Sequence, residues 1–256
     1  MASLSTRSEI THKAAEILSQ ARHAIVFTGA GVSTPSGIPD FRGEKNGLWK
    51  KSDPMRVASR TSFFQTPGVF YDWFRPLFMT SWKALPNKAH IAIAKLETAS
   101  LAKAILTQNI DGLHQKAGAR KVLELHGSAL LFSCPNCRLQ VKAEEVYTLF
   151  EKGLELPLCQ KCRSVIKPEV VLFEEPLPED IWKEAESEAR QADVILVVGS
   201  SLEVFPASMI PQNALAHGCK LIINNFSPTP LDAYASCLVR QDAASFFPEL
   251  LAQLKL

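Results

Sequence analysis

Four of the six cysteines stand in two tight pairs whose spacing is typical of a metal site. The pairs, separated by 21 intervening residues, are Cys134 with Cys137 and Cys159 with Cys162. Thiolates in two such knuckles bind Zn²⁺ tetrahedrally and leave no position open for water or substrate, so the pattern predicts a structural zinc site. Two surface disulfides are the less favoured alternative. Cys219 and Cys237 have no partner of this kind and are expected in the core.

A histidine follows the third short apolar run of the chain, in the sequence Glu124-Leu125-His126-Gly127-Ser128. Catalytic groups gather at the ends of buried strands, and an imidazole titrates near neutrality. His126 can therefore take a proton from a sugar hydroxyl at physiological pH, and we predict that it is a general base. We expect structural roles for His12, His23, His90 and His217, and His114 is open to both interpretations.

A glycine-rich segment, GAGVSTPSGIPDFRG, follows the first apolar run at residues 29–43. Glycines at a strand-to-helix turn let backbone N–H groups approach a pyrophosphate, which a helix N-terminus favours electrostatically. Tight turns use glycine for other reasons, and GAG is not the full GxGxxG pattern. However, Asp40, Phe41 and Arg42 add a carboxylate, an aromatic face and a fixed cation beside this turn. A purely structural loop rarely needs all three.

Polar side chains follow the second apolar run in TQNIDGLH at residues 107–114. Ligands bind at the carboxyl ends of the strands of an open parallel sheet, where Gln108, Asn109 and Asp111 can meet ribose hydroxyls or a carboxamide. A turn with a helix N-cap explains the same residues equally well.

Three further segments are compatible with a nucleotide site. The small-residue turn GSSLEV at residues 199–204 follows another buried strand. The last expected strand ends in Asn224-Asn225, and Asp242-Ala243 opens the expected C-terminal helix.

Short apolar runs alternate with helical patterns along the chain. The runs have the profile of strands buried on both faces and cover residues 24–28, 104–107, 122–125, 194–198 and 221–223. Apolar residues at helical spacing predict intervening helices at about residues 10–21, 89–99, 178–191 and 206–217. This alternation predicts an α/β fold with a doubly wound, Rossmann-like parallel sheet.

Two stretches interrupt the alternation. Residues 44–86 are rich in aromatics and prolines, and residues 132–167 contain the cysteine pairs. We expect these stretches to form a smaller second domain with a helical module and a zinc-knuckle module. The Rossmann-like domain then comprises residues 1–43, 87–131 and 168–256.

Composition narrows the class of protein. A length of 256 residues fits one large domain or one domain with a modest insert, and 46% hydrophobic and 21% charged residues are ordinary for a soluble enzyme. The net charge of +2 predicts neither nucleic-acid nor membrane-surface binding. No secretory signal is recognisable, and no apolar run approaches the roughly 20 residues that span a bilayer. With the cysteine usage, this predicts a cytoplasmic location.

Together and in this order, the motifs resemble those of the sirtuin family. The resemblance runs from about residue 21 to residue 251 and rests on GAGVSTPSGIPDFRG, TQNIDGLHQKAG, ELHGS, the two CxxC pairs, VVLFEEPLP and GSSLEVFPA. It implies an NAD-dependent protein-lysine deacylase, in which NAD⁺ is a co-substrate. The acyl oxygen of the lysine amide attacks C1′ of the nicotinamide ribose and expels nicotinamide. The products are free lysine and 2′-O-acyl-ADP-ribose.

The same resemblance implies roles for individual residues. The catalytic residues would be His126, as base toward the ribose hydroxyls, and Asn109. Phe41 would shield the reacting face from water. The residues lining NAD would be Gly29, Ala30, Ser33, Asp40, Phe41, Arg42, Gln108, Asn109, Asp111, Gly199, Ser200, Ser201, Asn225, Asp242 and Ala243.

The acyl-lysine peptide is expected as an added strand between the two domains. Its expected contacts are Ile110, Val171, Leu172, Phe173, Glu203 and Val204. Where the common family pattern is V-x-F-G-E, this chain has Glu174 in place of the glycine. This substitution puts the local backbone in question, and its carboxylate is expected to favour basic peptides.

The acyl preference is expected to depend on a helical stretch of the small domain. Sirtuins that prefer succinyl or malonyl lysine carry a Tyr-x-x-Arg pair there, whereas this chain has Tyr71 followed by Phe74, with Arg75 one position late. One position rotates a helical side chain by about 100°, so Arg75 should point away from the acyl group. We therefore predict deacetylation, with longer aliphatic acyls as an extension, and weak desuccinylation. An irregular helix near Pro67 or Pro76 that returns Arg75 to the pocket is the alternative.

Three other functions compete with this interpretation. A conventional NAD-dependent dehydrogenase shares the fold but has no need of the cysteine knuckles. A non-enzymatic zinc-knuckle binding protein leaves the GAG and TQNID motifs unexplained. An ADP-ribosyltransferase or NAD hydrolase is the closest alternative, because it also releases nicotinamide.

Overall fold

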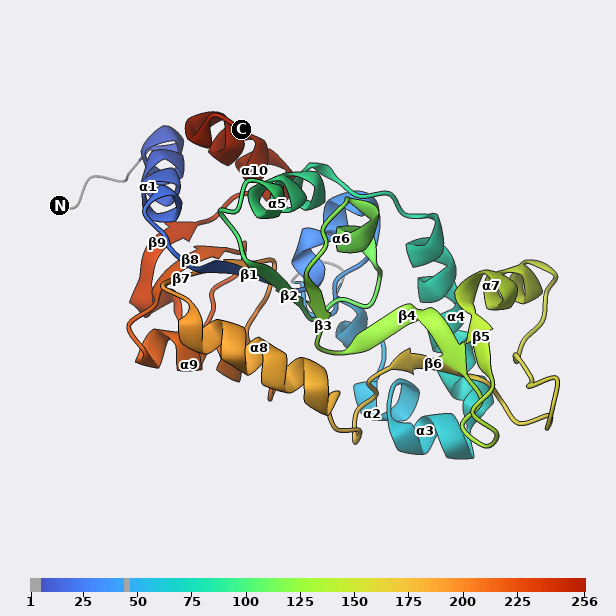
Figure 1. Ribbon diagram of the computed structural model, residues 1–256. Helices are drawn as coiled ribbons and strands as arrows, with labels where there is room; N and C mark the ends of the chain where they lie inside the picture. The colour runs from blue at the N-terminus through green and yellow to red at the C-terminus, as the bar shows by residue number, and fades with distance from the viewer. Residues whose placement is uncertain (1–5, 44–46) are drawn as a thin grey trace.

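The computed structural model describes residues 6–43 and 47–256, and its main element is a parallel sheet with the strand order β3-β2-β1-β7-β8-β9 (Figure 1). The strands are β1 (Ala24–Thr28), β2 (Ala104–Thr107), β3 (Val122–Glu124), β7 (Val194–Val198), β8 (Lys220–Asn224) and β9 (Ala235–Val239). Each neighbouring pair is parallel. The five strands expected from the apolar runs are all present, which confirms the doubly wound fold.

The expectation that the strand ending at Asn224-Asn225 is the last one is wrong, because β9 follows it. β9 lies at the edge of the sheet and pairs with β8 alone among the described strands. Its residues ASCLV are only partly buried, so they do not form the continuous apolar run that marked the inner strands.

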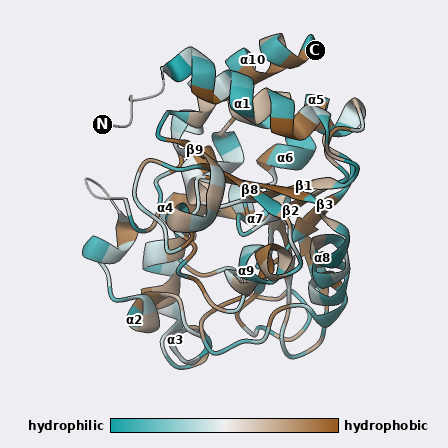
Figure 2. Ribbon diagram, turned by 90° about the vertical axis from the view of Figure 1, so that its left-hand side faces the viewer, coloured by the Kyte–Doolittle hydropathy of each residue, from teal (hydrophilic) through white to brown (hydrophobic). Residues whose placement is uncertain are grey.

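Helices cover both faces of the sheet, as Figures 1 and 2 show. One face carries α1 (Arg7–Ser19), α5 (Lys88–Thr98) and α10 (Ala243–Leu254), and the other carries α8 (Glu179–Gln191) and α9 (Met209–Ala216). In Figure 2 the brown, hydrophobic strands lie between these layers. Helix α1 begins with a capping box of Thr6 and Glu9, and Asp242 caps α10 by accepting from the Ser245 N–H.

A second core lies beside the sheet, built from aromatic side chains such as Phe70, Phe78 and Phe132. The surrounding helices are α2 (Pro54–Val57), α3 (Arg60–Gln65), α4 (Pro67–Lys83) and α7 (Ala143–Glu151). Helices α4 and α7 pack against an antiparallel sheet of order β5-β4-β6, formed by Gln140–Lys142, Gly127–Ser133 and Lys167–Val170, and α2 and α3 pack against α4. The shorter elements are η1 (Ala30–Val32), η2 (Thr34–Ser36), η3 (Leu48–Lys50), α6 (Leu113–Lys116) and η4 (Asp232–Tyr234).

We keep the division into a Rossmann-like domain and a small domain as a proposal. Two of its boundaries, at residues 131–132 and 167–168, fall inside β4 and β6. Residues 44–46, where the helical module is expected to begin, and residues 1–5 lie outside the described residues. Within the described part of the chain, no helix is both long enough and apolar enough to cross a membrane.

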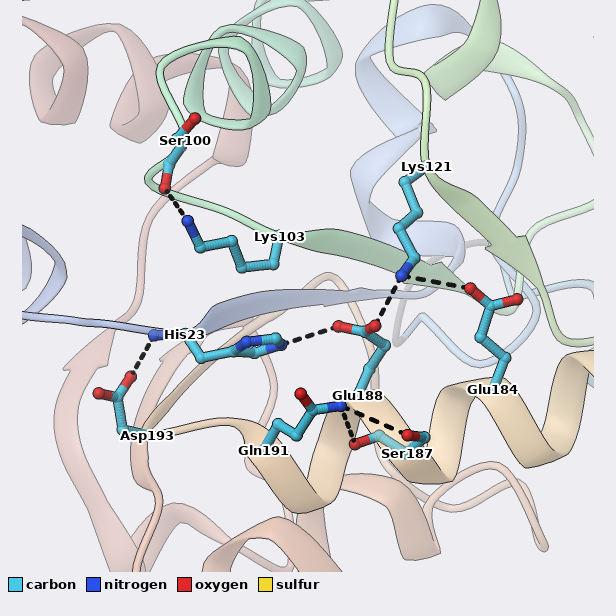
Figure 3. Close-up of polar contacts among 9 residues, drawn as sticks. All are labelled: His23, Ser100, Lys103, Lys121, Glu184, Ser187, Glu188, Gln191 and Asp193. Carbon is cyan, nitrogen blue, oxygen red and sulfur yellow. Dashed lines mark hydrogen bonds and ion pairs between the residues drawn. The ribbon is translucent and has the colours of Figure 1, made fainter.

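A polar network ties α8 to the amino-terminal ends of the strands (Figure 3). The buried carboxylate of Glu188 lies 2.6 Å from Lys121 Nζ and 2.8 Å from His23 Nε2. Lys121 precedes β3, and His23 precedes β1. Asp193 accepts from the His23 N–H at 3.0 Å, and Glu184 lies 3.2 Å from Lys121. The network therefore holds one helix against two strands.

Replacing Glu188 with Ala is expected to lower the free energy of unfolding by about 2 kcal/mol, since Lys121 and His23 lose a charged partner. The loss is smaller than for a fully buried pair because the Lys121 side chain is 40% exposed. Glu184→Ala on the same helix is the matched control, and it should change stability by less than about 0.5 kcal/mol because it removes only an exposed pair. Equal losses in urea unfolding would contradict this account.

Candidate active site

The loops after β1 and β7 meet where the strand order reverses. The Gly31 N–H donates to the Gly199 carbonyl at 2.9 Å, and a Cβ on Gly31 would lie 2.7 Å from Gly199 Cα. Gly199 itself has a φ of 61°, in the left-handed region that favours glycine. The two loops can approach this closely only without side chains. They leave bare backbone at the topological switch point, where open α/β sheets bind their ligands.

The expectation of a helix N-terminus after Gly29 is wrong. The chain forms two 3₁₀ turns there, η1 and η2, and the second ends at Gly37 with a φ of 86°. Turns of three residues are too short to build the dipole of an α-helix. An anion at this edge would therefore depend on backbone N–H groups and on the nearby Arg42 guanidinium.

Three of the predicted NAD-binding residues form one buried cluster. Ser33 Oγ donates to Asp111 Oδ2 at 2.7 Å, and Asn109 Nδ2 donates to Ser33 Oγ and to the Gly29 carbonyl, both at 3.2 Å. Close by, Gln108 Nε2 donates to Ser200 Oγ at 2.8 Å. The structure thus brings the loops after β1, β2 and β7 together through polar side chains.

Two buried histidines support this cluster. His90 Nε2 lies 3.3 Å from Ser33 Oγ, and His114 Nε2 lies 3.0 Å from Thr28 Oγ1. Their ring centroids are 5.0 Å apart. Burial lowers the pKa of His90 to about 4 and that of His114 to about 3, although Asp111 opposes the shift at His90. A structural role was predicted for His90, but no sequence signal indicated its contact with Ser33.

Acid is expected to destabilise the protein through this pair. An unfolded histidine titrates near 6.5, whereas the folded chain keeps His114 neutral down to about 3. Below 6.5 the unfolded state therefore binds more protons, and the free energy of unfolding should fall as the pH decreases toward about 4 and then 3. Urea unfolding at a series of pH values measures this slope. His114→Gln should flatten it, and the same slope in wild type and variant would contradict the prediction.

His126 lies past the end of β3 with one ring nitrogen engaged. Its Nδ1 is 2.9 Å from the Gln108 carbonyl oxygen, which can only accept, so Nδ1 carries the proton. Nε2 keeps its lone pair and has no hydrogen-bond partner in the part of the chain that the structure describes. Burial lowers the pKa of His126, the hydrogen bond to Gln108 opposes this, and the Arg42 cation lowers it further. The ring is therefore neutral at physiological pH, as a general base must be.

Four rings form what we call the aromatic wall: Phe41, Trp49, Trp73 and Phe173. Trp49 stacks on Phe41 at 5.0 Å and on Trp73 at 5.4 Å between centroids, and its centroid lies 6.0 Å from that of Phe173, edge to face. The wall thus joins a predicted NAD residue, Phe41, to a predicted peptide residue, Phe173.

Beside the aromatic wall, Arg42 Nε lies 3.3 Å from Glu203 Oε2, so a predicted NAD residue and a predicted peptide residue form an ion pair. Asp40 is engaged locally and accepts from the Gly43 N–H at 2.9 Å.

The structure places Tyr71 and Phe74 in the second, aromatic core rather than on an open surface. Their exposed fractions are 0% and 3%, and the Tyr71 hydroxyl donates to the Ile166 carbonyl. Arg75 Nη1 donates to the Leu154 carbonyl at 3.4 Å. The acyl contact of Tyr71 and Phe74 stays a prediction, and the α4 side chain that joins the aromatic wall is Trp73.

Glu174 has a φ of 75°, in the left-handed region that a glycine adopts more easily. Its Oε2 accepts from the Thr61 N–H at 2.8 Å and so caps α3. This N–H lowers the pKa of the Glu174 carboxyl. Because the carboxylate is engaged with α3, the expectation that it attracts basic peptides has no support in this geometry. The cap offsets part of the cost of a left-handed, non-glycine residue.

The remaining predicted peptide residues surround His126 and the β7 loop. Val171 N–H donates to the His126 carbonyl at 2.8 Å, and the Ile110 carbonyl accepts from Ala129. Leu172 is buried, and Val204 and Ser201 are half-buried. The Phe173 N–H and carbonyl pair with Ala58 and Arg60, so this residue offers its side chain more readily than its backbone.

Three predicted NAD-binding residues are far from His126 in the sequence, namely Asn225, Asp242 and Ala243. They follow β8 and β9, at the carboxyl edge of the parallel sheet. The Asn225 N–H donates to the Val239 carbonyl at 3.2 Å, and Ala243 is buried. Next to them, the buried side-chain oxygens of Asn224 and Gln241 have no partner among the described residues. Sequence reasoning named Asn224 as part of a segment compatible with a nucleotide site but missed Gln241.

The four cysteines converge as expected. Their sulfur atoms all lie within 4.8 Å of one another, with 3.4 Å between Cys134 and Cys162 and 3.5 Å between Cys137 and Cys159. Thiolates around one tetrahedral Zn²⁺ would lie roughly 3.8 Å apart, so the set fits that ion. Hydrogen bonding to Ser164 lowers the pKa of Cys162 to about 6, which favours the thiolate that metals bind.

Comparison with known proteins decides the family, because the model of the Sir2 family matches residues 29–206. The chain belongs to the Sir2, or sirtuin, family. This Sir2 chain is 47% identical to NAD-dependent protein deacylase 2 of Archaeoglobus fulgidus over 95% of each sequence. A solved structure of a Sir2 enzyme superimposes with a TM-score of 0.90 at 46% identity, covering 97% of this chain and 98% of the other.

A second solved Sir2 structure is a histidine-to-alanine variant with a deacetylated p53 peptide and 3′-O-acetyl ADP ribose. It also has a TM-score of 0.90, at 38% identity, and the match covers 94% of this chain and 97% of that one. The family match spans the loops after β1, β2, β3 and β7, and it ends before Asn225 and Asp242.

Proposed function

We infer that this Sir2 chain is an NAD-dependent protein-lysine deacylase. The observation that carries the inference is the assembly at the switch point, where the Ser33, Asn109 and Asp111 cluster lies between glycine loops and His126 keeps Nε2 free. Comparable relatives are named for NAD-dependent deacylation and deacetylation. NAD⁺, when bound, supplies the ADP-ribose that takes up the acyl group as nicotinamide leaves.

We propose separate roles in binding, proton transfer and exclusion of water for the residues of the site. Asn109 and Asp111 hold the nicotinamide ribose and carboxamide, for which their mutual contacts through Ser33 fix the orientation. Nε2 of His126 accepts a proton from a ribose hydroxyl, while Nδ1–H stays on the Gln108 carbonyl. Phe41 keeps water from the reacting carbon.

The rest of the dinucleotide is proposed to follow the carboxyl edge of the sheet. The close approach of Gly29 and Gly199 leaves room for the phosphates beside Ala30, with Arg42 as the cation. The N–H groups of Gly29 and Gly199 themselves donate to the Val198 and Asn224 carbonyls. Asn225, Asp242 and Ala243 then lie at the adenosine end, where Asn224 and Gln241 have unpaired acceptors within the described residues.

We propose that the acyl-lysine peptide enters beside His126 and pairs with backbone near residues 203–205 as an added strand. Ile110, Val171 and Phe173 would surround the lysine stem. The closed set of four cysteines would hold a structural Zn²⁺ remote from the chemistry, because four sulfur ligands leave no open position.

A product experiment tests the function. NAD⁺ and a panel of acyl-lysine peptides are incubated with the protein, and the products are identified by mass spectrometry. Deacylation yields unmodified peptide, nicotinamide and O-acyl-ADP-ribose. ADP-ribose with untouched peptide would indicate an NAD hydrolase instead, and a peptide heavier by ADP-ribose would indicate a transferase.

Acetyl-lysine is expected to exceed succinyl-lysine in kcat/KM by about tenfold or more, because a buried carboxylate without a cation is costly. Arg75, the nearest candidate cation on α4, is engaged with the Leu154 carbonyl and lies 4.0 Å from Asp72. The two peptides should differ only in the acyl group. A preference for succinyl would mean that Arg75 turns into the pocket.

We propose a cytoplasmic location and an acyl-lysine protein as the partner, with no direct nucleic-acid or membrane binding. None of the six cysteines forms a disulfide, which is the usual state in a reducing compartment. Cell fractionation with a compartment marker tests the location.

A further inference from the structure

The ion pair of Arg42 and Glu203 joins the proposed NAD site to the proposed peptide site. Arg42 Nε lies 3.3 Å from Glu203 Oε2, and the two side chains are 35% and 57% exposed. Neither side chain has another ion-pair or hydrogen-bond partner among the described residues. An exposed pair of this kind contributes only about 0 to 1 kcal/mol, because water and salt screen it. A stronger partner for either side chain therefore separates the pair.

Glu203 stands on an anchored loop. Leu202, immediately before it, is buried with a φ of 58°, and its N–H donates to Ser200 Oγ at 3.2 Å. The Val204 carbonyl accepts from the Ser208 N–H at 2.8 Å. By contrast, the N–H and carbonyl of Glu203 have no partner in the described part of the chain. Glu203 therefore offers both its backbone and its carboxylate where the peptide is proposed to add as a strand.

Arg42 has a stronger partner in the proposed reaction. It is the cation beside the proposed position of the phosphates, and its charge reaches His126, whose pKa it lowers. A pyrophosphate carries two negative charges, and arginine binds phosphate through charge-assisted, bidentate hydrogen bonds that are stronger than one exposed ion pair. The phosphates and Glu203 therefore compete for one guanidinium.

We propose that Glu203 selects peptides with a basic side chain beside the acyl-lysine, and that it does so only after Arg42 has turned from it to the phosphates of NAD⁺. The inference rests on the proposed function. While Arg42 neutralises the Glu203 carboxylate, a basic peptide gains little from it. Once unpaired, this carboxylate accepts from a lysine or arginine of the peptide. Binding of NAD⁺ and binding of a basic peptide are thus positively coupled, and Glu203 rather than Glu174 is the carboxylate that the peptide meets.

Peptide binding with and without ADP-ribose tests the coupling. ADP-ribose has the pyrophosphate but no nicotinamide, so no acyl transfer takes place during the measurement. Fluorescent acetyl-lysine peptides with arginine or glutamine at each flanking position in turn are titrated by anisotropy. At the position that faces Glu203, ADP-ribose should raise the affinity for the arginine peptide about two- to fivefold more than that for the glutamine peptide, as an exposed ion pair allows. By linkage, the arginine peptide should tighten ADP-ribose binding by the same factor.

Glu203→Gln removes the charge and keeps the size of the side chain. It should abolish the arginine preference and its dependence on ADP-ribose. Without peptide, the variant should bind ADP-ribose about two- to fivefold more tightly than wild type, because Arg42 no longer has to leave a carboxylate. Glu179→Gln is the matched control, since Glu179 is an exposed carboxylate that pairs with Lys183 of its own helix at 2.5 Å. It should behave as wild type in each measurement.

An arginine preference of equal size with and without ADP-ribose, or one that Glu203→Gln leaves unchanged, would overturn the proposal. No arginine preference at any flanking position would overturn it as well. Turnover of the glutamine peptide with NAD⁺ measures the deacylase function separately. Acetyl removal upholds that function whatever the binding ratios are, whereas its absence would contradict the deacylase function, and the inference would fall with it.

Discussion

His126→Ala is expected to lower kcat for deacylation by about 10² to 10⁴-fold, the usual contribution of a general base. The reason is geometric, because Nδ1 is held by the Gln108 carbonyl at 2.9 Å and Nε2 alone can accept the substrate proton. Alanine has no group that could accept this proton. Binding of NAD⁺, measured by calorimetry, should be largely retained, because the Ser33, Asn109 and Asp111 cluster does not include His126.

The pH dependence of wild type adds a second measure of the same base. The pKa of His126 is lowered, mainly by burial. Its neutral form therefore persists below the usual value of 6.5, and kcat/KM should fall only as the pH drops through the lowered pKa. The acid limb should thus lie below pH 6.5.

His217→Ala is the control for loss of an imidazole, since the exposed His217 ring bonds only to the Asn213 carbonyl among the described residues. It should retain near wild-type turnover. A folded His126→Ala variant with near-normal kcat would refute the assignment of the base.

Loss of the zinc site is expected to unfold the small domain, with a destabilisation above about 4 kcal/mol. Cys159→Ala removes one of four sulfurs, and metal analysis should show the bound Zn²⁺ fall from about one per chain toward none. Loss of zinc should disturb more than the cysteine knuckles, because the buried Cys134 and Cys159 pack in the same hydrophobic cluster as Phe74 and Phe132.

Cys237→Ala is the matched control, because it removes another buried thiol, one that packs in the core between the parallel sheet and α1. It should keep the metal and cost only the packing of a small side chain. Purified wild-type protein without zinc, or a Cys159→Ala variant as stable as Cys237→Ala, would contradict a structural metal.

Loss of the small-domain core should also impair deacylation indirectly. The Tyr71 hydroxyl bridges α4 to the Ile166 carbonyl in the zinc module, and Trp73 of the same helix belongs to the aromatic wall. Melting of the module would therefore displace the wall. Deacylation and tryptophan fluorescence should then decline together as a chelator removes zinc.

Local pattern was sufficient for five of the six strands of the parallel sheet and for the cluster of four cysteines. A strand buried on both faces needs a continuous apolar run, so β1 and β7 could be recognised from their own residues. Each cysteine pair forms a turn within a few residues. In both turns the residue after the second cysteine is an arginine in the left-handed region, Arg138 or Arg163. Such features depend on neighbours in the chain.

The edge strand β9 and the 3₁₀ turns after Gly29 differ from what the sequence predicted, and each difference has a physical reason. β9 has one partner strand, so its burial is incomplete and its sequence lacks a continuous apolar run. After Gly29 the glycine-rich segment was expected to lead into a helix. Close contact with Gly199 holds the backbone in 3₁₀ turns instead. Tertiary contact overrode the local preference in both places.

By itself the sequence determined the doubly wound sheet, the four metal ligands and the strand-end motifs whose order marks a Sir2 chain. Only the tertiary structure decided which side chains meet: His90 reaches Ser33 across 57 positions, and Glu174 turns to cap α3. The same holds on α4, where Trp73 rather than Phe74 joins the aromatic wall. Spacing along the chain determines which face of a helix or strand a side chain occupies. Which residue of another element it contacts depends on how the separate elements pack.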